Sequence, residues 1–199
     1  LCKHKSGNFS IRDKETGYVV VTPSGVNREE LTVDDICVLT VDGELIEVKN
    51  GRRPSSETMM HLEVYKARGD IMAIVHTHSK MATSFAVLNK PIPAIIYEVA
   101  TFGLKDAVVP VAPYARPGTV ELAKSVIEPV KRADIFLLEK HGVVACGTDM
   151  YEAFLRAQYV EELAEVYYYT LLINKGNEPA SFSPEELERW KYPEKLEKK

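Results

Sequence analysis

Short apolar runs alternate with polar turns rich in glycine and proline along most of the chain. These runs predict strands at residues 18–21, 36–41, 45–48, 71–75, 94–97, 108–111, 135–138 and 143–146. Apolar residues at helical spacing predict helices over residues 59–68, 81–88, 119–130 and 149–174. Ser183 followed by Pro184 is typical of the start of a further short helix. Strands mixed with helices indicate an α/β or α+β protein.

The predicted helix over residues 149–174 is apolar around more of its circumference than one core contact requires. Residues at core spacing are Phe154, Ala157, Val160, Leu163, Ala164, Tyr167 and Leu171. Tyr168, Tyr169 and Leu172 widen that face. The helix is therefore expected to contribute both to the core and to a subunit interface.

Composition narrows the classes of protein. A length of 199 residues predicts one domain over residues 1–199, with a terminal helix and tail from about residue 183. Lys and Arg number 25 against 29 Asp and Glu, so the chain has no basic surplus for a nucleic-acid backbone. No run approaches the ~20 apolar residues that a membrane span needs. Cys2, Cys37 and Cys146 are scattered without CxxC spacing, which predicts no disulfide framework and a reducing, cytoplasmic compartment.

His76 and His78 carry the strongest chemical signal. Two positions apart on a predicted strand, their side chains project to one face and both can reach one ion. A catalytic zinc site needs three protein ligands, and His141, in a short loop between two predicted strands, is the best third candidate. A hydrogen-bonded histidine pair at a strand end is the alternative interpretation. His4 and His61 are weaker ligand candidates.

Glu57 follows Pro54, Ser55 and Ser56 just before a predicted helix. Hydroxyls and free backbone N–H groups at a helix N-terminus bind anions, so the two serines are candidates for holding a phosphate beside the carboxylate. The alternative is that one serine caps the helix and Glu57 only interacts favourably with its dipole.

Taken together, these segments resemble the class II aldolase/adducin family, most closely its branch that cleaves L-fuculose 1-phosphate. The matching motifs run in order through nearly the whole chain: Gly7-Asn8-Phe9-Ser10, Thr22-Pro23-Ser24-Gly25, Pro54-Ser55-Ser56-Glu57 with His61, His76-Thr77-His78-Ser79, Ile92-Pro93-Ala94-Ile95-Ile96-Tyr97, Ala112-Pro113-Tyr114-Ala115, Gly118-Thr119 and His141-Gly142. The first two of these motifs are, taken alone, ordinary small polar turns.

The resemblance implies a three-layer α/β/α sandwich with a central, largely antiparallel sheet. It also implies a homotetramer with active sites between subunits, and a helix that precedes Gly7, so we expect sequence upstream of Leu1.

The resemblance further implies the roles of individual residues. One zinc ion is expected on His76, His78 and His141, with Glu57 as catalytic carboxylate and further candidate metal ligand. The phosphate pocket maps onto Asn8, Ser24, Gly25, Ser55 and Ser56. Two catalytic tyrosines match Tyr97 and, in the C-terminal tail, Tyr192.

The implied activity is that of a zinc-dependent aldehyde-lyase. It reversibly cleaves a ketose 1-phosphate, L-fuculose 1-phosphate, to dihydroxyacetone phosphate and L-lactaldehyde. The metal stabilises the carbanion as a Lewis acid, so no lysine Schiff base is needed. Glu57 is expected to move the proton at the dihydroxyacetone-phosphate carbon, and Tyr97 to exchange one with the aldehyde-side oxygen. Three imidazoles also accept manganese or cobalt.

Three other functions remain open on the same resemblance. L-Ribulose-5-phosphate 4-epimerases use the same metal logic but carry an aspartate where Glu57 stands. Methylthioribulose-1-phosphate dehydratases share the glutamate. Adducin-like heads are interaction modules that lack the metal histidines, so the three histidines here argue against that function.

Overall fold

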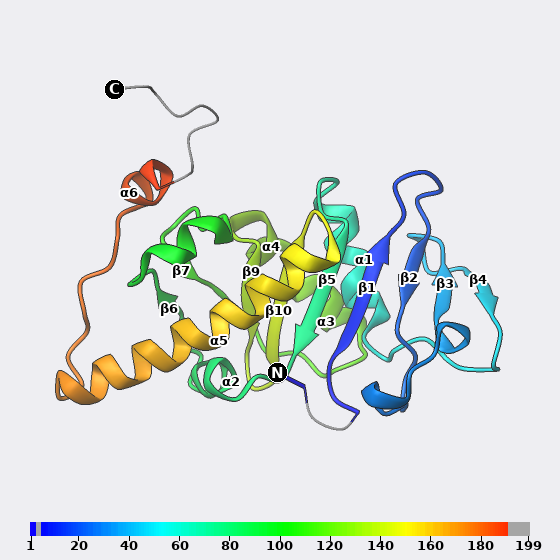
Figure 1. Ribbon diagram of the computed structural model, residues 1–199, viewed down its shortest axis with the longest axis horizontal. Helices are drawn as coiled ribbons and strands as arrows, with labels where there is room; N and C mark the ends of the chain where they lie inside the picture. The colour runs from blue at the N-terminus through cyan, green and yellow to red at the C-terminus, as the bar shows by residue number, and fades with distance from the viewer. Residues whose placement is uncertain (3–4, 191–199) are drawn as a thin grey trace.

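β-Branched and other apolar runs pair into one large sheet in this computed structural model, which describes residues 1–2 and 5–190 (Figure 1). Among the described residues the sheet has eight strands, in the order β4 (Leu45–Val48), β3 (Cys37–Leu39), β2 (Val19–Val21), β1 (Asn8–Arg12), β5 (Ala73–Thr77), β10 (Gly142–Gly147), β9 (Ile135–Leu138) and β8 (Val111–Ala112). Every neighbouring pair is antiparallel except β8 and β9. The predicted largely antiparallel sheet is confirmed.

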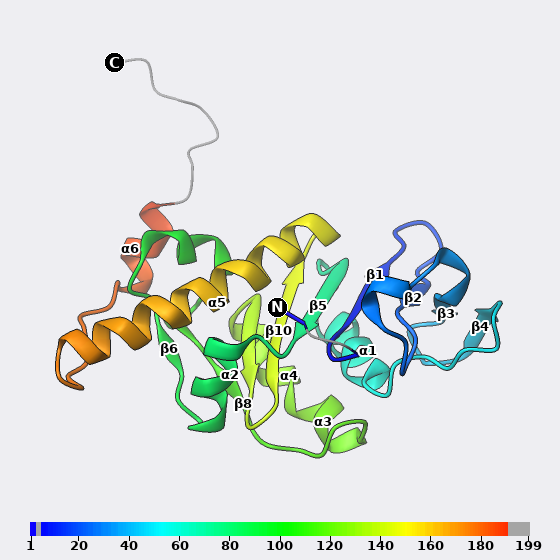
Figure 2. The same cartoon turned by 60° about the horizontal axis from the view of Figure 1, so that its bottom comes forward.

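Helices cover both faces of the central strands (Figure 2). Val75 and Ala145 face α2 (Lys80–Val87) and α5 (Met150–Ile173) in one core cluster. Ile74 and Val144, one position away, belong to a second cluster with three helices, α1 (Thr58–Ala67), α3 (Val120–Ser125) and α4 (Ile127–Arg132). Because successive strand residues point to opposite faces, continuous apolar runs suit strands covered on both sides. This arrangement confirms the three-layer sandwich.

The long helix α5 begins where Oδ1 of Asp149 accepts a hydrogen bond from the backbone N–H of Glu152, at 2.8 Å. Its buried stripe is Ala153, Ala157, Val160, Leu163, Ala164 and Tyr167. The C-terminal end of α5 projects past the strands in Figure 1, where Tyr169 and Leu172 remain more than half exposed. The apolar face is therefore wider than the core of one chain uses.

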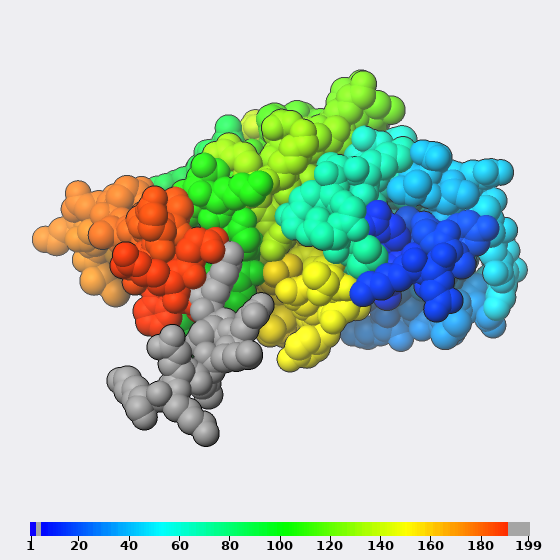
Figure 3. Space-filling model, turned by 90° about the horizontal axis from the view of Figure 1, so that it is seen from above, coloured from blue at the N-terminus to red at the C-terminus, as the bar shows by residue number. Residues whose placement is uncertain are grey.

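Smaller elements complete the described chain. A second sheet pairs β6 (Ile92–Pro93) with β7 (Val108–Val109). Three 3₁₀ helices are η1 (Arg28–Glu30), η2 (Val33–Asp35) and η3 (Tyr97–Phe102). The predicted terminal helix is α6 (Pro184–Arg189), which is capped by Ser183 and packs against η3 (Figure 3). All three cysteines are free, and no helix within the described ranges is long and apolar enough to cross a membrane.

Two predicted elements are divided, and proline explains both. Residues 108–111 form β7 and β8 in different sheets, because Pro110 between them has no N–H to donate to a strand ladder. Residues 119–130 form α3 and α4, because Pro129 cannot donate to the carbonyl of Ser125 four residues earlier.

Two other predictions are wrong. Residues 94–96 form no strand, and Tyr97 begins η3 instead. Residues 8–10, which resemble a polar turn, begin β1. Asn8 and Ser10 alternate with Phe9 in a strand period, but both polar side chains are buried rather than solvated. Their partners explain why, as described below.

Candidate active site

Four side chains meet where β5 ends and β10 begins. His76 is the second-last residue of β5, His78 follows the strand, His141 precedes β10, and Glu57 lies at the N-terminus of α1. One ligating atom from each lies within 4.8 Å of the others. Nε2 of His76 is 3.0 Å from Nε2 of His78 and 3.2 Å from Oε2 of Glu57. The structure thus brings together the four residues predicted to surround a metal.

Antiparallel pairing of β5 with β10 produces this meeting. Thr77 lies opposite Val143, so the end of β5 is level with the turn that carries His141. Gly142 makes the close approach possible, since a Cβ there would lie 2.4 Å from the carbonyl oxygen of Thr77 and within 3.2 Å of two histidine rings. No side chain larger than hydrogen fits at that position.

The donor set fits a divalent cation. Nδ1 of His76 lies 2.8 Å from the carbonyl oxygen of Val143 and must donate to it, which leaves Nε2 as the ring nitrogen that faces the cluster. Burial, together with the neighbouring His76 and His141, lowers the pKa of His78 to about 4, so that imidazole is neutral at pH 7. Imidazole nitrogens and carboxylate oxygens are ligands that zinc sites use.

Glu57 is held as a carboxylate. Burial alone raises its pKa, but the rings of His141 and His76 beside it more than offset burial, and the net shift is downward. Oε1 of Glu57 lies 3.0 Å from Nε2 of His141. Oε1 of Glu57 and Nδ1 of His141 are both buried without a hydrogen bond to any described residue. Unsatisfied buried polar atoms indicate that this cluster is completed by a ligand.

A buried chain of hydrogen bonds runs away from Glu57. Oε2 of Glu57 accepts from Nδ2 of Asn8 at 2.8 Å, and Oδ1 of Asn8 lies 2.6 Å from Nε2 of His61. Nδ1 of His61 lies 2.6 Å from Oγ of Ser10, which lies 2.8 Å from the Tyr65 hydroxyl. His61 therefore stands behind the cluster and is not one of its members. His4 lies outside the described residues.

A cavity of about 300 Å³ opens beside the cluster. Glu57, His78 and His141 form part of its wall. All five residues expected around a phosphate also line it: Asn8, Ser24, Gly25, Ser55 and Ser56. The structure therefore places the predicted phosphate residues and the predicted metal ligands around one small cavity.

Arg28, which no sequence motif indicates, also lines this cavity. It donates to the carbonyl oxygens of Gly7, Lys5 and Pro23. Its Nε is buried without a partner, and burial lowers the pKa of Arg28. Lys5 lines the same cavity. Arg28 follows Ser24 and Gly25 by only a few residues, and this proximity is the one sequence feature that links it to the cavity. A lone arginine in a polar loop is usually solvated, so proximity alone does not predict a binding role.

Of the two predicted tyrosines, only Tyr97 lies within the described residues, and it does not line the cavity of its own chain. Tyr97 is 57% exposed, and its ring centroid lies 5.7 Å from that of Trp190. Among the described residues, no tyrosine lines the cavity beside Glu57. Tyr192 lies outside the described residues.

The sequence and the fold were also compared with those of known proteins. The sequence model of the class II aldolase and adducin N-terminal domain matches residues 1–168. The chain belongs to the class II aldolase and adducin family. The predicted family is therefore confirmed.

Aldolases are prominent among the family relatives. The chain is 39% identical over 188 residues to 5-deoxy-D-ribulose 1-phosphate aldolase of Bacillus thuringiensis serovar kurstaki, covering 94% of this chain and 84% of that protein. It is 38% identical over 168 residues to L-fuculose phosphate aldolase of Escherichia coli strain K12, covering 84% and 75%. A solved L-fuculose 1-phosphate aldolase superposes with a TM-score of 0.87 at 37% identity, covering 96% and 86%. These likenesses support a class II aldolase, a lyase, with a metal-binding group of residues.

Proposed function

We propose that the protein is a zinc-dependent aldolase that reversibly cleaves a ketose 1-phosphate to dihydroxyacetone phosphate and a short aldehyde. The observation that carries this proposal is the convergence of Glu57 with three imidazoles at the wall of a cavity lined by the predicted phosphate residues. L-Fuculose 1-phosphate, which gives L-lactaldehyde, is the first expected substrate. A 5-deoxypentulose 1-phosphate, after the relative in Bacillus thuringiensis, is the second.

Both substrates share the half that becomes dihydroxyacetone phosphate. In this proposal Ser24, Gly25, Ser55 and Ser56 hold the phosphate through hydroxyl and backbone N–H groups, beside the charge of Arg28. The shared half then occupies the described cavity. The aldehyde half, which differs between the substrates, extends out of it.

His76, His78 and His141 would hold the metal ion, with Glu57 beside it. A bound divalent cation supplies Lewis-acid stabilisation of the negative charge that C–C cleavage leaves next to a carbonyl, worth several kcal/mol. Glu57 moves the proton at the dihydroxyacetone-phosphate carbon. Oε1 serves for that transfer because Oε2 accepts the amide N–H of Asn8.

We further propose that the working enzyme is a homotetramer with each site completed by a neighbouring subunit. The exposed Tyr97 would then meet the aldehyde-side oxygen of a substrate bound to another subunit, with Tyr192 of the tail as its second tyrosine. The exposed apolar end of α5, including Tyr169 and Leu172, supports burial of this region between copies. Three free cysteines support a reducing, cytoplasmic compartment.

The test is product analysis with the zinc-loaded protein. Dihydroxyacetone phosphate is incubated with L-lactaldehyde, acetaldehyde and a panel of other aldehydes, with an EDTA-treated sample as control. Carbon–carbon bond formation that depends on the metal is the expected result. An epimerised pentulose phosphate or a dehydrated diketone from ketose substrates, without aldehyde release, would assign the site to another reaction. No turnover and no stoichiometric metal would favour an interaction module.

A further inference from the structure

We propose that His61 is a positioning residue of this site, which fixes the side-chain amide of Asn8 in the one orientation that donates to Glu57. The effect on turnover rests on the proposed function, whereas the orientation itself does not. His61 does not line the cavity, and its ring nitrogens contact Asn8 and Ser10, so the ring acts on the Glu57 carboxylate through Asn8.

The direction of each hydrogen bond follows from its chemistry. An ionised carboxylate only accepts, so the Asn8 atom 2.8 Å from Oε2 of Glu57 is the NH₂ group. Oδ1 of Asn8 then faces Nε2 of His61, which must carry a proton and donate. Neutral His61 therefore accepts at Nδ1, and the donor is the hydroxyl of Ser10.

The contact between Ser10 and Tyr65 is the last hydrogen bond of this series. Ser10 has one proton and gives it to His61, so its oxygen accepts from the Tyr65 hydroxyl at 2.8 Å. Five side chains thus form one directed series that starts at Tyr65 and ends at Glu57. No member has a free choice of donor and acceptor.

Burial makes this series rigid. Asn8, Ser10, His61 and Tyr65 are each at most 3% exposed, so water cannot replace a missing partner. Burial, reinforced by the nearby His76, lowers the pKa of His61 to about 3, which keeps the ring neutral. Burial also raises the pKa of Tyr65, whose hydroxyl stays a donor.

The elements place the series between a strand and a helix. Asn8 and Ser10 are two positions apart on β1 and point to one face of the sheet. His61 and Tyr65 are four positions apart on α1, the helix that begins at Glu57, and point to that face. The series therefore ties the carboxylate of Glu57 to the sheet that carries His76.

Rotating the Asn8 amide by half a turn shows what His61 prevents. Oδ1 would then lie about where Nδ2 now lies, against a carboxylate oxygen, and NH₂ would face the proton of His61. Both contacts would be repulsive. His61 thus leaves Glu57 with a donor on Oε2 and none on Oε1, the arrangement that the proposed proton transfer uses.

The orientation is tested directly by long-range ¹H–¹⁵N NMR of the histidine rings in zinc-loaded protein. The His61 signal is identified by its loss in His61→Gln. We expect a neutral ring protonated at Nε2 at pH 7. A ring protonated at Nδ1, or on both nitrogens, overturns the proposal.

The consequence is tested with two variants. His61→Gln keeps a donor toward Asn8, while His61→Leu removes it at similar volume. We expect His61→Leu to lower kcat about 10- to 100-fold with little change in KM, and to weaken Co²⁺ binding, read from its visible spectrum, by a similar factor. His61→Gln should recover most of both. A folded, metal-loaded Leu variant with wild-type kcat and Co²⁺ affinity overturns the proposal.

Other outcomes are also decisive. Tyr65→Phe removes only the far end of the series and should have a smaller effect than His61→Leu. If His61→Leu does not fold, the NMR tautomer and the Co²⁺ affinity of the Gln variant decide. If wild-type protein forms no aldol product, the proposed function fails, while the tautomer and Co²⁺ measurements still test the positioning role.

Discussion

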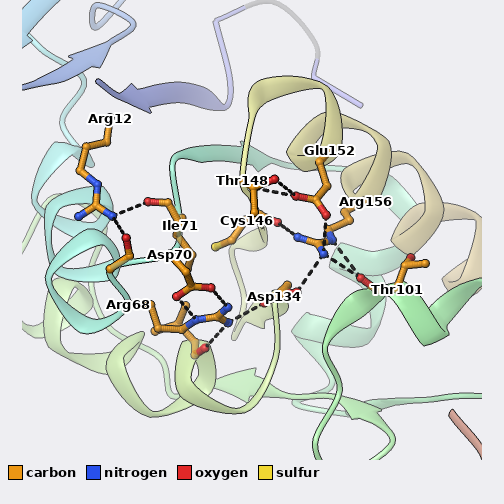
Figure 4. Close-up of polar contacts among 12 residues, drawn as sticks. Arg12, Arg68, Asp70, Ile71, Thr101, Asp134, Cys146, Thr148, Glu152 and Arg156 are labelled. Atoms are coloured by element: carbon orange, nitrogen blue, oxygen red, sulfur yellow. Dashed lines mark hydrogen bonds and ion pairs between the residues drawn. The ribbon is translucent and has the colours of Figure 1, made fainter. Parts of the chain in front are cut away.

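Two clusters of charged and polar side chains lie at opposite ends of the same strands, and they differ in how completely their charges are paired. Glu57 and the three histidines lie where β5 ends, while Arg68, Asp134 and Arg156 lie where it begins (Figure 4). Both contain charged side chains that are buried or partly buried. The difference is whether those charges find all their partners within the chain.

At the arginine end, they do. Asp134 accepts from Arg68 at 2.5 Å and pairs with Arg156 at 3.0 Å. Arg68 also forms two hydrogen bonds to the carboxylate of Asp70, and Arg156 donates to the backbone oxygens of Thr101 and Cys146. No atom of these three cluster residues is among the unsatisfied buried side-chain atoms of the described chain.

At the histidine end, unsatisfied atoms remain on Glu57 and His141. A network whose donors and acceptors all have partners within the chain is typical of a structural role. Buried donors or acceptors without such partners indicate a site for a ligand, water or ion. We therefore expect the arginine end to contribute stability and the histidine end to bind a ligand.

Glu57→Gln should produce the largest change, and only in activity. Losing a proton-transfer group lowers kcat about 10²- to 10⁴-fold, as measured by aldehyde formation from the ketose phosphate. Glu63→Gln, on the same helix with an exposed partner, is the matched control and should leave kcat unchanged. Cleavage at nearly the wild-type rate in Glu57→Gln would remove Glu57 from its proposed role.

Asp134→Asn should show the opposite pattern. Removing one partner from a largely buried ion network costs about 3 kcal/mol in the free energy of unfolding, measured with urea, because Arg68 and Arg156 each lose one carboxylate partner. Activity of the folded fraction should stay at the wild-type level. Asp106→Asn, which breaks an exposed pair with Arg132, is the control and should change stability little. Equal losses in both variants would contradict the comparison.

Lowering the pH should destabilise the folded protein by protonating His61 in the unfolded state. The pKa of His61 is about 3 in the folded chain and about 6.5 when unfolded, so between these values the unfolded state binds the extra proton. The stability from burying neutral His61 is complete above pH 6.5 and is lost as the pH falls toward 3. Relative to His61→Gln, metal-free wild type should lose on the order of 3 kcal/mol between pH 7 and pH 4. A difference independent of pH would contradict this.

Arg28→Gln should have the smallest effect on turnover, and the change is expected chiefly in anion binding. A hydrogen bond to a charged group contributes about 1.5–3 kcal/mol, so the affinity for inorganic phosphate, measured by calorimetry, should fall about 10- to 100-fold. Arg132→Gln, which removes an exposed cation elsewhere, is the control. Unchanged phosphate affinity in Arg28→Gln would place the phosphate away from this cavity.

The apolar patterns predict the central strands and the long helix because their apolar residues pack into the core next to the sheet. Strand β1 was missed because Asn8 and Ser10 are polar yet buried, and only their partners on α1 explain it. Those partners depend on how a strand and a helix meet in space, which no local window contains. The breaks at Pro110 and Pro129 were, in contrast, readable from the sequence.

For the site, residue type and motif order were enough to select Glu57 and the three histidines. They were not enough to find Arg28 or the hydrogen-bond series behind Glu57, since neither forms a motif. Tyr97 stays a prediction, because it is exposed and does not line the cavity beside Glu57.

The central claim is that Glu57, His76, His78 and His141 surround one metal ion. Metal analysis of the purified protein, combined with X-ray absorption at the edge of the metal found, tests it most directly. We predict one divalent ion per chain with three imidazole ligands, and loss of that ion in His76→Ala. A protein without a stoichiometric ion after incubation with zinc, or an ion without histidine ligands, would contradict the account.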